Sequence, residues 1–137
     1  MSRSEFSHEL LPLGIFGAHP LDDLTEDELL PLVDQIDLET RKLVAAYLRA
    51  GQSVLAFMAY SRDVIADKFG VSGGPAIWTD GVYFYRHEAA EYIETYGIGI
   101  PADAITLMSL SDWKPPKFQQ ADVVEYSEWL RANAKHF

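Results

Sequence analysis

Apolar residues between positions 24 and 51 recur every three or four residues, which is the period of an α-helix that buries one side. Thr25, with Glu28 three positions later, has the form of a capping box and predicts a helix that runs to about Gln35. Asp37 is a suitable N-cap for a second helix, which Gly51 is expected to end. The expected buried stripe of the second helix comprises Leu43, Val44, Tyr47 and Leu48.

The next two segments have the composition of β-strands. Ser53–Tyr60 is nearly continuously apolar, which predicts a strand of about six residues that is buried on both faces. Asp63–Gly70 fits either a helical turn or a strand followed by an irregular loop, and we favour the strand. Val71–Gly74 contains two glycines and predicts a flexible turn.

The stretch TDGVYFYRHEAAEYI, from Thr79 to Ile93, places a turn and several aromatic residues ahead of a helical pattern. Asp80-Gly81 is a strong signal for a two-residue type I′ hairpin turn, which would pair Thr79 with Val82. Side chains alternate along a strand, so the hairpin has two faces. The expected core face carries Ile77, Thr79, Val82 and Phe84, and the opposite face carries Trp78, Tyr83 and Tyr85.

The face with Trp78, Tyr83 and Tyr85 has two interpretations. Amphipathic aromatic residues tolerate partial exposure and often anchor protein interfaces, which favours a binding edge. Neighbouring helices could instead cover all three side chains, as in a core. The sequence leaves both interpretations open.

Helical patterns return after the hairpin. EAAEYIETY predicts a helix that ends at Gly97, with a buried stripe of Ala89, Tyr92, Ile93 and Tyr96. Pro101 is expected at the first position of a helix to about Leu110. The segment SDWKPPKF predicts a loop, and Asp122 to Lys135 predicts a closing helix with Val123, Val124, Trp129 and Leu130 as packing residues.

This order of elements predicts one α+β domain over residues 1–137, in which N-terminal and C-terminal helices cover a small antiparallel sheet. Residues 1–20 contain no clear period and are expected to form an irregular strap. Five apolar side chains of this strap should cross the core, because exposing them all to water would be costly. They are Leu10, Leu11, Leu13, Ile15 and Phe16.

The negative charge of the chain is concentrated near its start. The net charge is −10, and residues 1–40 contain ten acidic side chains but only one basic side chain, Arg3. Such a surface repels nucleic acid and anionic membranes and attracts basic proteins, although it is also typical of a solvated face. Five carboxylates lie within seven residues, at Asp22, Asp23, Glu26, Asp27 and Glu28.

Motifs of known chemistry do not occur in the sequence. There is no cysteine, no GxxxxGK[ST], no GxSxG and no HExxH. Scattered polar groups invite a metal or acid–base interpretation: His19 with Asp22 and Asp23, Asp63 with Asp67, and Glu88 with Glu91 and Glu94. We interpret the first two as loop residues and the third as the solvated side of a helix, so we expect no catalytic residue, metal or cofactor. With no apolar run of membrane length and no signal peptide pattern, a cytoplasmic location is expected.

The segment YLRAG…AIWTDGVYFYRHEAAEYIETYGIGIPADAI, within about Tyr47 to Leu107, resembles small acidic bacterial immunity proteins that neutralise polymorphic or secretion-system toxins. The shared features are a YLR helix end, a T-D-G hairpin with aromatics, a helix with Tyr-Ile, and an aliphatic-Pro step. The family pattern often has Trp after the turn, whereas Val82 and Tyr83 follow Gly81 here. The resemblance implies a scaffold and an inhibitory role, and it carries over no functional residue.

Together these features favour a non-catalytic immunity protein that occludes the active site of a basic toxin or effector domain. We expect it to bind neither nucleic acid nor membrane, and a homodimer remains open. The alternatives are a regulatory or structural subunit of a larger assembly, or a small-molecule-binding domain or enzyme that uses His87, Tyr85 and Glu91. The expected partner-binding residues are Asp22, Asp23, Glu26, Asp27, Glu28, Trp78, Tyr83 and Tyr85.

Overall fold

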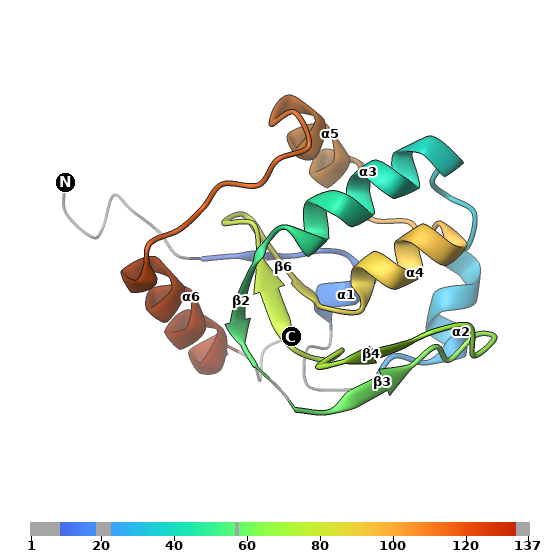
Figure 1. Ribbon diagram of the computed structural model, residues 1–137, viewed down its shortest axis with the longest axis horizontal. Helices are drawn as coiled ribbons and strands as arrows, with labels where there is room; N and C mark the ends of the chain where they lie inside the picture. The colour runs from blue at the N-terminus through green and yellow to red at the C-terminus, as the bar shows by residue number, and fades with distance from the viewer. Residues whose placement is uncertain (1–8, 19–22, 57, 134–137) are drawn as a thin grey trace.

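A computed structural model describes residues 9–18, 23–56 and 58–133, and it confirms the α+β class (Figure 1). The helices are α1 (Ile15–Ala18), α2 (Glu26–Leu29), the 3₁₀-helix η2 (Leu30–Leu32), α3 (Leu38–Arg49), α4 (Ala89–Tyr96), α5 (Ala102–Leu110) and α6 (Gln120–Asn133). The strands are β1 (Leu11–Pro12), β2 (Gln52–Leu55), β3 (Tyr60–Arg62), β4 (Gly70–Ser72), β5 (Ile77–Thr79) and β6 (Tyr83–Arg86).

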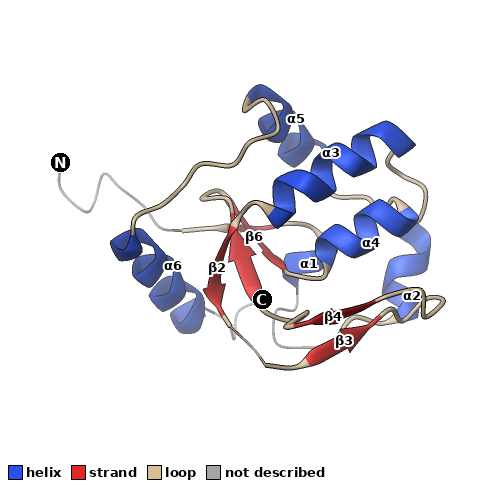
Figure 2. Ribbon diagram, viewed as in Figure 1, coloured by secondary structure: helices blue, strands red, loops and turns tan. Residues whose placement is uncertain are grey.

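Helices cover both faces of the main sheet, which has the strand order β1-β6-β5-β2 (Figure 2). The helix α6 covers one face, where Tyr126 and Leu130 pack in one cluster with Ile77 and Phe84. The opposite face packs against α3 and α4, in the larger cluster that contains Tyr83 and Tyr85. The strands β3 and β4 form a separate antiparallel hairpin.

The main sheet is mixed, and the prediction of a purely antiparallel sheet was wrong at one edge. The strand β1 runs parallel to β6 and pairs Leu11 with Tyr83 and Pro12 with Phe84. The irregular strap predicted for residues 1–20 therefore contributes a strand and a short helix. Its apolar residues are divided, because Leu10, Leu13 and Phe16 are buried, Ile15 is half-buried and Leu11 is exposed.

The β5–β6 hairpin has a different register from the one predicted. Thr79 pairs with Phe84 and Trp78 with Tyr85, so the turn is centred beyond Asp80. The Asp80 carboxylate accepts hydrogen bonds from the amides of Val82 and Tyr83, at 2.9 and 2.7 Å. The side chain of Asp80 thus closes the turn that a type I′ backbone was expected to close. The register differs from the predicted one by an even number of residues, so each strand side chain stays on its predicted face of the sheet. Val82 is the exception to the predicted core face, because it is exposed.

The predicted strand over Ser53–Tyr60 is divided in two. The strand β2 ends at Leu55, and β3 begins at Tyr60. Burial on both faces was also wrong, because Ser53 and Met58 are exposed while Val54 is buried. Residues 63–69 form the loop between β3 and β4, so the strand favoured for Asp63–Gly70 was wrong. Half of the predicted turn Val71–Gly74 belongs to β4, which is Gly70–Ser72.

The predicted helix starts agree with the structure where a side-chain cap defines them. Thr25 accepts from the Glu28 amide at 3.3 Å, and Asp37 accepts from the Thr40 amide at 2.9 Å. The helix ends were less accurate. The helix α2 stops at Leu29 and tightens into η2, where Pro31 cannot continue the α-helical bonding. Gly97, with φ 65°, ends α4 as predicted.

The remaining differences concern single positions. Pro101 is the N-cap of α5, one residue before its predicted place. Leu43 and Val124 are exposed, whereas both were predicted to pack in the core. The predicted stripe of α4 is buried throughout. In the part of the chain that the structure describes, no helix combines the length and apolarity needed to cross a membrane.

Candidate functional site

A hollow of about 400 Å³ opens where three segments of the chain meet. One wall is the segment before α2, with Asp23 and Leu24, and a second wall is the β3–β4 hairpin, with Tyr60. Arg86, the last residue of β6, and Glu88, the N-cap of α4, also line the hollow and are almost fully buried. The hollow therefore combines a charged and aromatic rim with a buried polar floor.

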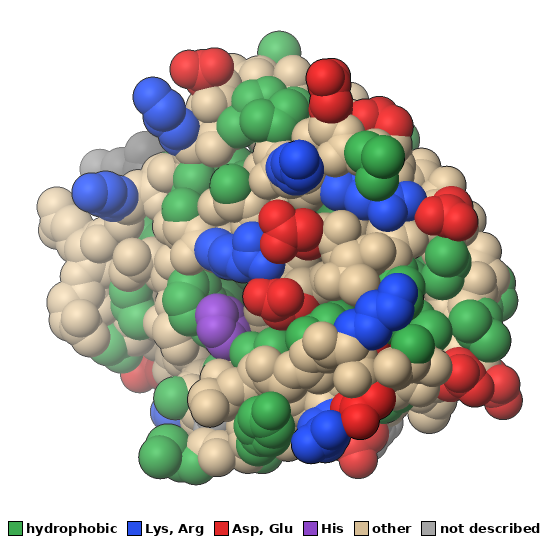
Figure 3. All heavy atoms as spheres, turned by 45° about the vertical axis from the view of Figure 1, so that its right-hand side comes forward, with side chains coloured by type: hydrophobic (Ala, Val, Ile, Leu, Met, Phe, Trp, Pro, Cys, Tyr) green, Lys and Arg blue, Asp and Glu red, His purple; other side chains and the backbone are tan. Residues whose placement is uncertain are grey.

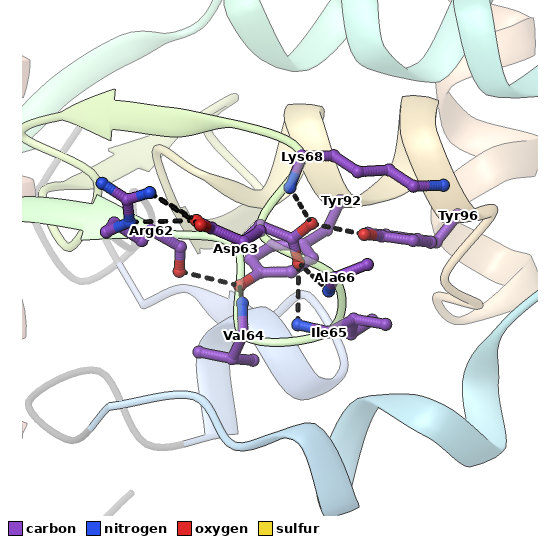
Figure 4. Close-up of polar contacts among 9 residues, drawn as sticks. Arg62, Asp63, Val64, Ile65, Ala66, Lys68, Tyr92 and Tyr96 are labelled. Atoms are coloured by element: carbon purple, nitrogen blue, oxygen red, sulfur yellow. Dashed lines mark hydrogen bonds and ion pairs between the residues drawn. The ribbon is translucent and has the colours of Figure 1, made fainter.

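The Asp63 carboxylate fixes the loop of the β3–β4 hairpin (Figure 4). It accepts hydrogen bonds from the backbone amides of Ile65, Ala66 and Lys68, at 2.8, 3.4 and 2.9 Å. It also accepts one from the Tyr96 hydroxyl of α4. Burial acts to raise the pKa of Asp63, but these hydrogen bonds outweigh burial and hold its pKa below the usual value.

The Tyr92 hydroxyl makes a second connection between the hairpin and α4. It accepts a hydrogen bond from the Val64 amide at 3.0 Å and donates one to the Arg62 carbonyl at 3.4 Å. Burial raises the pKa of Tyr92 to about 12, so the hydroxyl stays protonated at neutral pH. Tyr92 also lines the hollow, which means that one residue both anchors the hairpin and shapes the site.

The two arginines of the hollow are each matched by a carboxylate. The Arg62 guanidinium donates to both carboxylate oxygens of Asp67, at 2.9 and 2.8 Å. The Arg86 Nε donates to Glu88 Oε1 at 2.5 Å, and both side chains are 4% exposed or less. Paired in this way, neither guanidinium contributes a full uncompensated charge to the hollow.

The rim of the hollow is unusually exposed for apolar and aromatic side chains. Tyr60 is 59% exposed and Met58, two residues earlier, is 99% exposed. Val64, in the hairpin loop, is 40% exposed and also lines the hollow. Exposed groups of this kind beside a concave surface are typical of sites where another molecule docks.

The acidic segment predicted to bind a partner borders this hollow. Asp23 lines it directly, and Glu26 and Asp27 follow as exposed residues in the first turn of α2. In the described ranges, no ion pair is formed by these three side chains. Glu28 is half-buried and accepts a hydrogen bond from the Thr25 hydroxyl at 2.8 Å, so it takes part in the cap of α2. Asp22 lies outside the described residues.

The aromatic face predicted to bind a partner is largely internal. Tyr83 and Tyr85 are buried in the α3–α4 cluster, so the prediction that they form an exposed edge was wrong. The Tyr85 hydroxyl donates to the Leu48 carbonyl at 2.8 Å. Trp78 is half-buried and stacks on the His87 ring, with 4.4 Å between ring centroids. Of the two interpretations of this face, the one in which neighbouring helices cover the side chains is correct for Tyr83 and Tyr85.

The residues proposed for an enzyme or small-molecule site are engaged in structural contacts. Glu91 forms an ion pair of 2.8 Å with Arg49, which also pairs with Glu94. Burial, and then the charge of Arg49, lowers the pKa of His87 below its usual value. The third candidate, Tyr85, is fully buried.

Two carboxylates of the metal-like patterns, Asp63 and Glu88, are buried in structural contacts. Asp63 is buried at the centre of its loop, and the prediction of a plain surface loop for Asp63 and Asp67 was incomplete. Glu88 is buried as well, which corrects its prediction as a solvated residue. His19 and Asp22 fall outside the described residues. Over the ranges described, no group of three His, Cys, Asp or Glu side chains could hold a metal ion.

Sequence reasoning did not identify Asp63, Arg86, Glu88 or Tyr60 as parts of the site. The sequence did contain a signal for the pair Arg86 and Glu88, because these two residues stand at the ends of a short link between a buried strand and a helix with a buried face. Charges in such a link lie close to the core and require partners. A scan against protein-family models, a search of curated proteins and a search of solved structures found no match.

We expect Asp63→Asn to destabilise the protein by about 2 kcal/mol at pH 7, because it removes charge-assisted hydrogen bonds from a buried loop. The pKa of Asp63 is lower in the folded chain than in the unfolded one. Its stabilisation is therefore complete above its ordinary pKa of about 4 and is lost as the pH falls through the folded-state pKa. Urea unfolding at pH 7, 5 and 3 should show a smaller pH dependence for Asp63→Asn than for the wild type. Asp112→Asn, an exposed carboxylate distant from this loop in the sequence, is the control, and an identical pH dependence for Asp63→Asn and wild type would contradict the assignment.

We expect Glu88→Gln to lower the free energy of unfolding by about 3 kcal/mol, because it leaves the Arg86 guanidinium buried without its carboxylate. Glu91→Gln is a matched control on the neighbouring turn of α4, since its ion pair with Arg49 is partly exposed and should contribute less than about 1 kcal/mol. Thermal and urea unfolding monitored by tryptophan fluorescence would compare the two variants. Equal losses of stability would contradict a special role for the buried pair.

Proposed function

We propose that this protein is a non-catalytic, immunity-type inhibitor that binds a basic toxin or effector domain and occludes its active site. The observation that supports it best is the location of Asp23, Glu26 and Asp27. These carboxylates are exposed, lie beside the hollow, and form no ion pair among the described residues.

The acidic segment is held in one conformation, which favours recognition over simple solvation. The Thr25 cap fixes the first turn of α2, and Leu24 and Leu29 on either side of it are buried. A fixed group of like charges creates a local field that accelerates association with a basic surface. Because the backbone that carries these carboxylates is already ordered, binding costs little additional loop entropy.

The apolar and aromatic side chains beside the acidic segment can supply the desolvated contacts that charge alone does not provide. Tyr60 and Val64 are exposed and line the hollow with Asp23, and Met58, which is 99% exposed, lies two residues before Tyr60. Interfaces of high affinity combine desolvated aromatic or apolar anchors with a charged rim. The hollow region has both components within one continuous surface.

Several other charged groups among the described residues are paired with a group of opposite sign. Figure 3 shows a face of the molecule that carries both acidic and basic side chains, which lie next to one another near its centre. Two examples of this balance are Arg49 with Glu91 and Glu94, and Arg62 with Asp67. A basic partner would therefore be steered to the start of α2 in preference to such balanced regions.

The combined variant Asp23→Asn, Glu26→Gln, Asp27→Asn tests the proposal. We leave Glu28 unchanged because it takes part in the Thr25 cap. Affinity capture from the native lysate with mass spectrometry should give a basic, toxin-like partner at a one-to-one ratio. The variant should associate with it at least about tenfold more slowly than the wild type, with a weaker dependence on salt.

A second combined variant, Glu39→Gln, Asp112→Asn, Glu128→Gln, removes the same number of exposed carboxylates elsewhere. It should associate at nearly the wild-type rate. Equal effects of the two variants would show that only net charge matters and would contradict a specific acidic face. Capture of an enzyme complex or regulator in place of a toxin-like domain would overturn the inhibitor proposal.

A second candidate function, as a regulatory or structural subunit of a larger assembly, is favoured by the surface around α5. Leu110, the last residue of α5, is 81% exposed. Trp113 lines a second hollow, of about 340 Å³, together with Leu110 and Thr40. Trp113 also has φ 58°, a left-handed conformation that is costly for a bulky residue and often marks a functional position.

If the α5 surface joins copies of the chain, light scattering after size-exclusion chromatography should give a mass of two chains at micromolar concentration. Leu110→Ser should then return it to the mass of one chain, because it removes a highly exposed apolar side chain from that surface. Thr106→Ser, an exposed position on the same helix, is the control. A wild type that remains at 15.4 kDa at all concentrations would remove self-association from this second candidate.

A further inference from the structure

The balance of charges inside the hollow identifies the sign of its occupant. Four charged side chains line it: Asp23, Arg62, Arg86 and Glu88. Arg62 is occupied by Asp67, and Arg86 by Glu88. The charge left over is that of Asp23, for which the structure gives no counter-charge among the described residues.

An anion fits this arrangement poorly. Arg62 and Arg86 already face the carboxylates of Asp67 and Glu88, at 2.5 to 2.9 Å, so an anion that approached either guanidinium would be repelled by that carboxylate. It would also lie near the Asp23 carboxylate, and like charges at short range repel. A cation meets neither obstacle, because it can reach Asp23 without breaking an existing pair.

The walls suit a long side chain with a planar charged end. Leu24, Val64 and Pro75 provide apolar contacts for a methylene stem. The Tyr60 ring, 59% exposed at the rim, offers a face on which a guanidinium can stack. An arginine side chain matches both features, because its head is planar and forms a fork that fits a carboxylate.

We propose that the hollow is the receptor for an arginine side chain presented by the basic partner, with the guanidinium between Asp23 and Tyr60. This inference rests on the proposed function for the identity of the partner, but the hollow's preference for arginine can be measured without it. The site would act as the central anchor of the interface, while Glu26 and Asp27 steer the approach.

The test is a titration of the ¹⁵N-labelled full chain with Nα-acetyl-L-arginine methylamide, followed by two-dimensional NMR. The citrulline analogue is the matched probe, because it keeps the planar shape and the length of the side chain but loses the charge. We expect saturable shifts for the amides of Leu24, Ser61 and Val64 with the arginine probe. Citrulline should bind at least about fivefold more weakly.

Variants assign the effect to the hollow. Asp23→Asn should weaken binding of the arginine probe by at least about fivefold, and Tyr60→Leu should weaken it as well. Asp112→Asn, an exposed carboxylate on another part of the surface, is the control and should bind as the wild type does. The NMR spectra also report whether each variant is folded. Shifts that are equal for the two probes, or unchanged by Asp23→Asn, would overturn the inference.

The two proposals can fail separately. If a basic partner is captured but Asp23→Asn and Tyr60→Leu leave its affinity unchanged and the arginine probe does not bind, the arginine receptor is wrong while the inhibitor proposal stands. If the arginine probe binds as expected but the lysate gives no toxin-like partner, the hollow is confirmed as an arginine site and the inhibitor proposal fails.

Discussion

The rest of the structure around the hollow depends on the Asp63 carboxylate, which is buried and must be satisfied within the protein. A buried charge without partners is strongly unfavourable, so the loop after β3 has to fold around it. Three backbone amides and the Tyr96 hydroxyl meet this requirement together. The same carboxylate therefore fixes the conformation of the loop and attaches the β3–β4 hairpin to α4. Together with the β3–β4 pairing and the Tyr92 contacts, this carboxylate holds the wall that carries Tyr60 in place.

Asp80, like Asp63, accepts hydrogen bonds both from its own turn and from a side chain of a helix elsewhere in the chain. The Tyr47 hydroxyl of α3 donates to Asp80 Oδ2 at 2.7 Å, while the other oxygen of Asp80 closes the β5–β6 turn. Each of these aspartates thus joins a local turn to a distant helix. Among the described residues, no buried side-chain nitrogen or oxygen lacks a partner. Supports of this kind hold the hairpin rim, where Tyr60 and Val64 are exposed to a partner.

Local signals were sufficient for some elements and not for others. The caps at Thr25 and Asp37 and the stop at Gly97 depend on neighbouring residues, so the sequence predicted them correctly. The hairpin register depended on how the Asp80 side chain competes with the backbone, and its Tyr47 contact is 33 positions away. The burial of Tyr83 and Tyr85 likewise follows from which helices pack on the sheet. The acidic border of the hollow was predictable, whereas the floor and the aromatic rim required the assembled fold.

The short strand β1 lies at one edge of the main sheet, and its sequence decides what that edge can bind. Leu11 and Leu13 direct their amides inward, to the carbonyls of Val82 and Phe84. The residue between them is Pro12, whose nitrogen carries no hydrogen. The outward positions of β1 therefore offer no amide donor to a strand from another molecule. Such an edge is a poor template for intermolecular β pairing, and the protein is protected there against aggregation at high concentration.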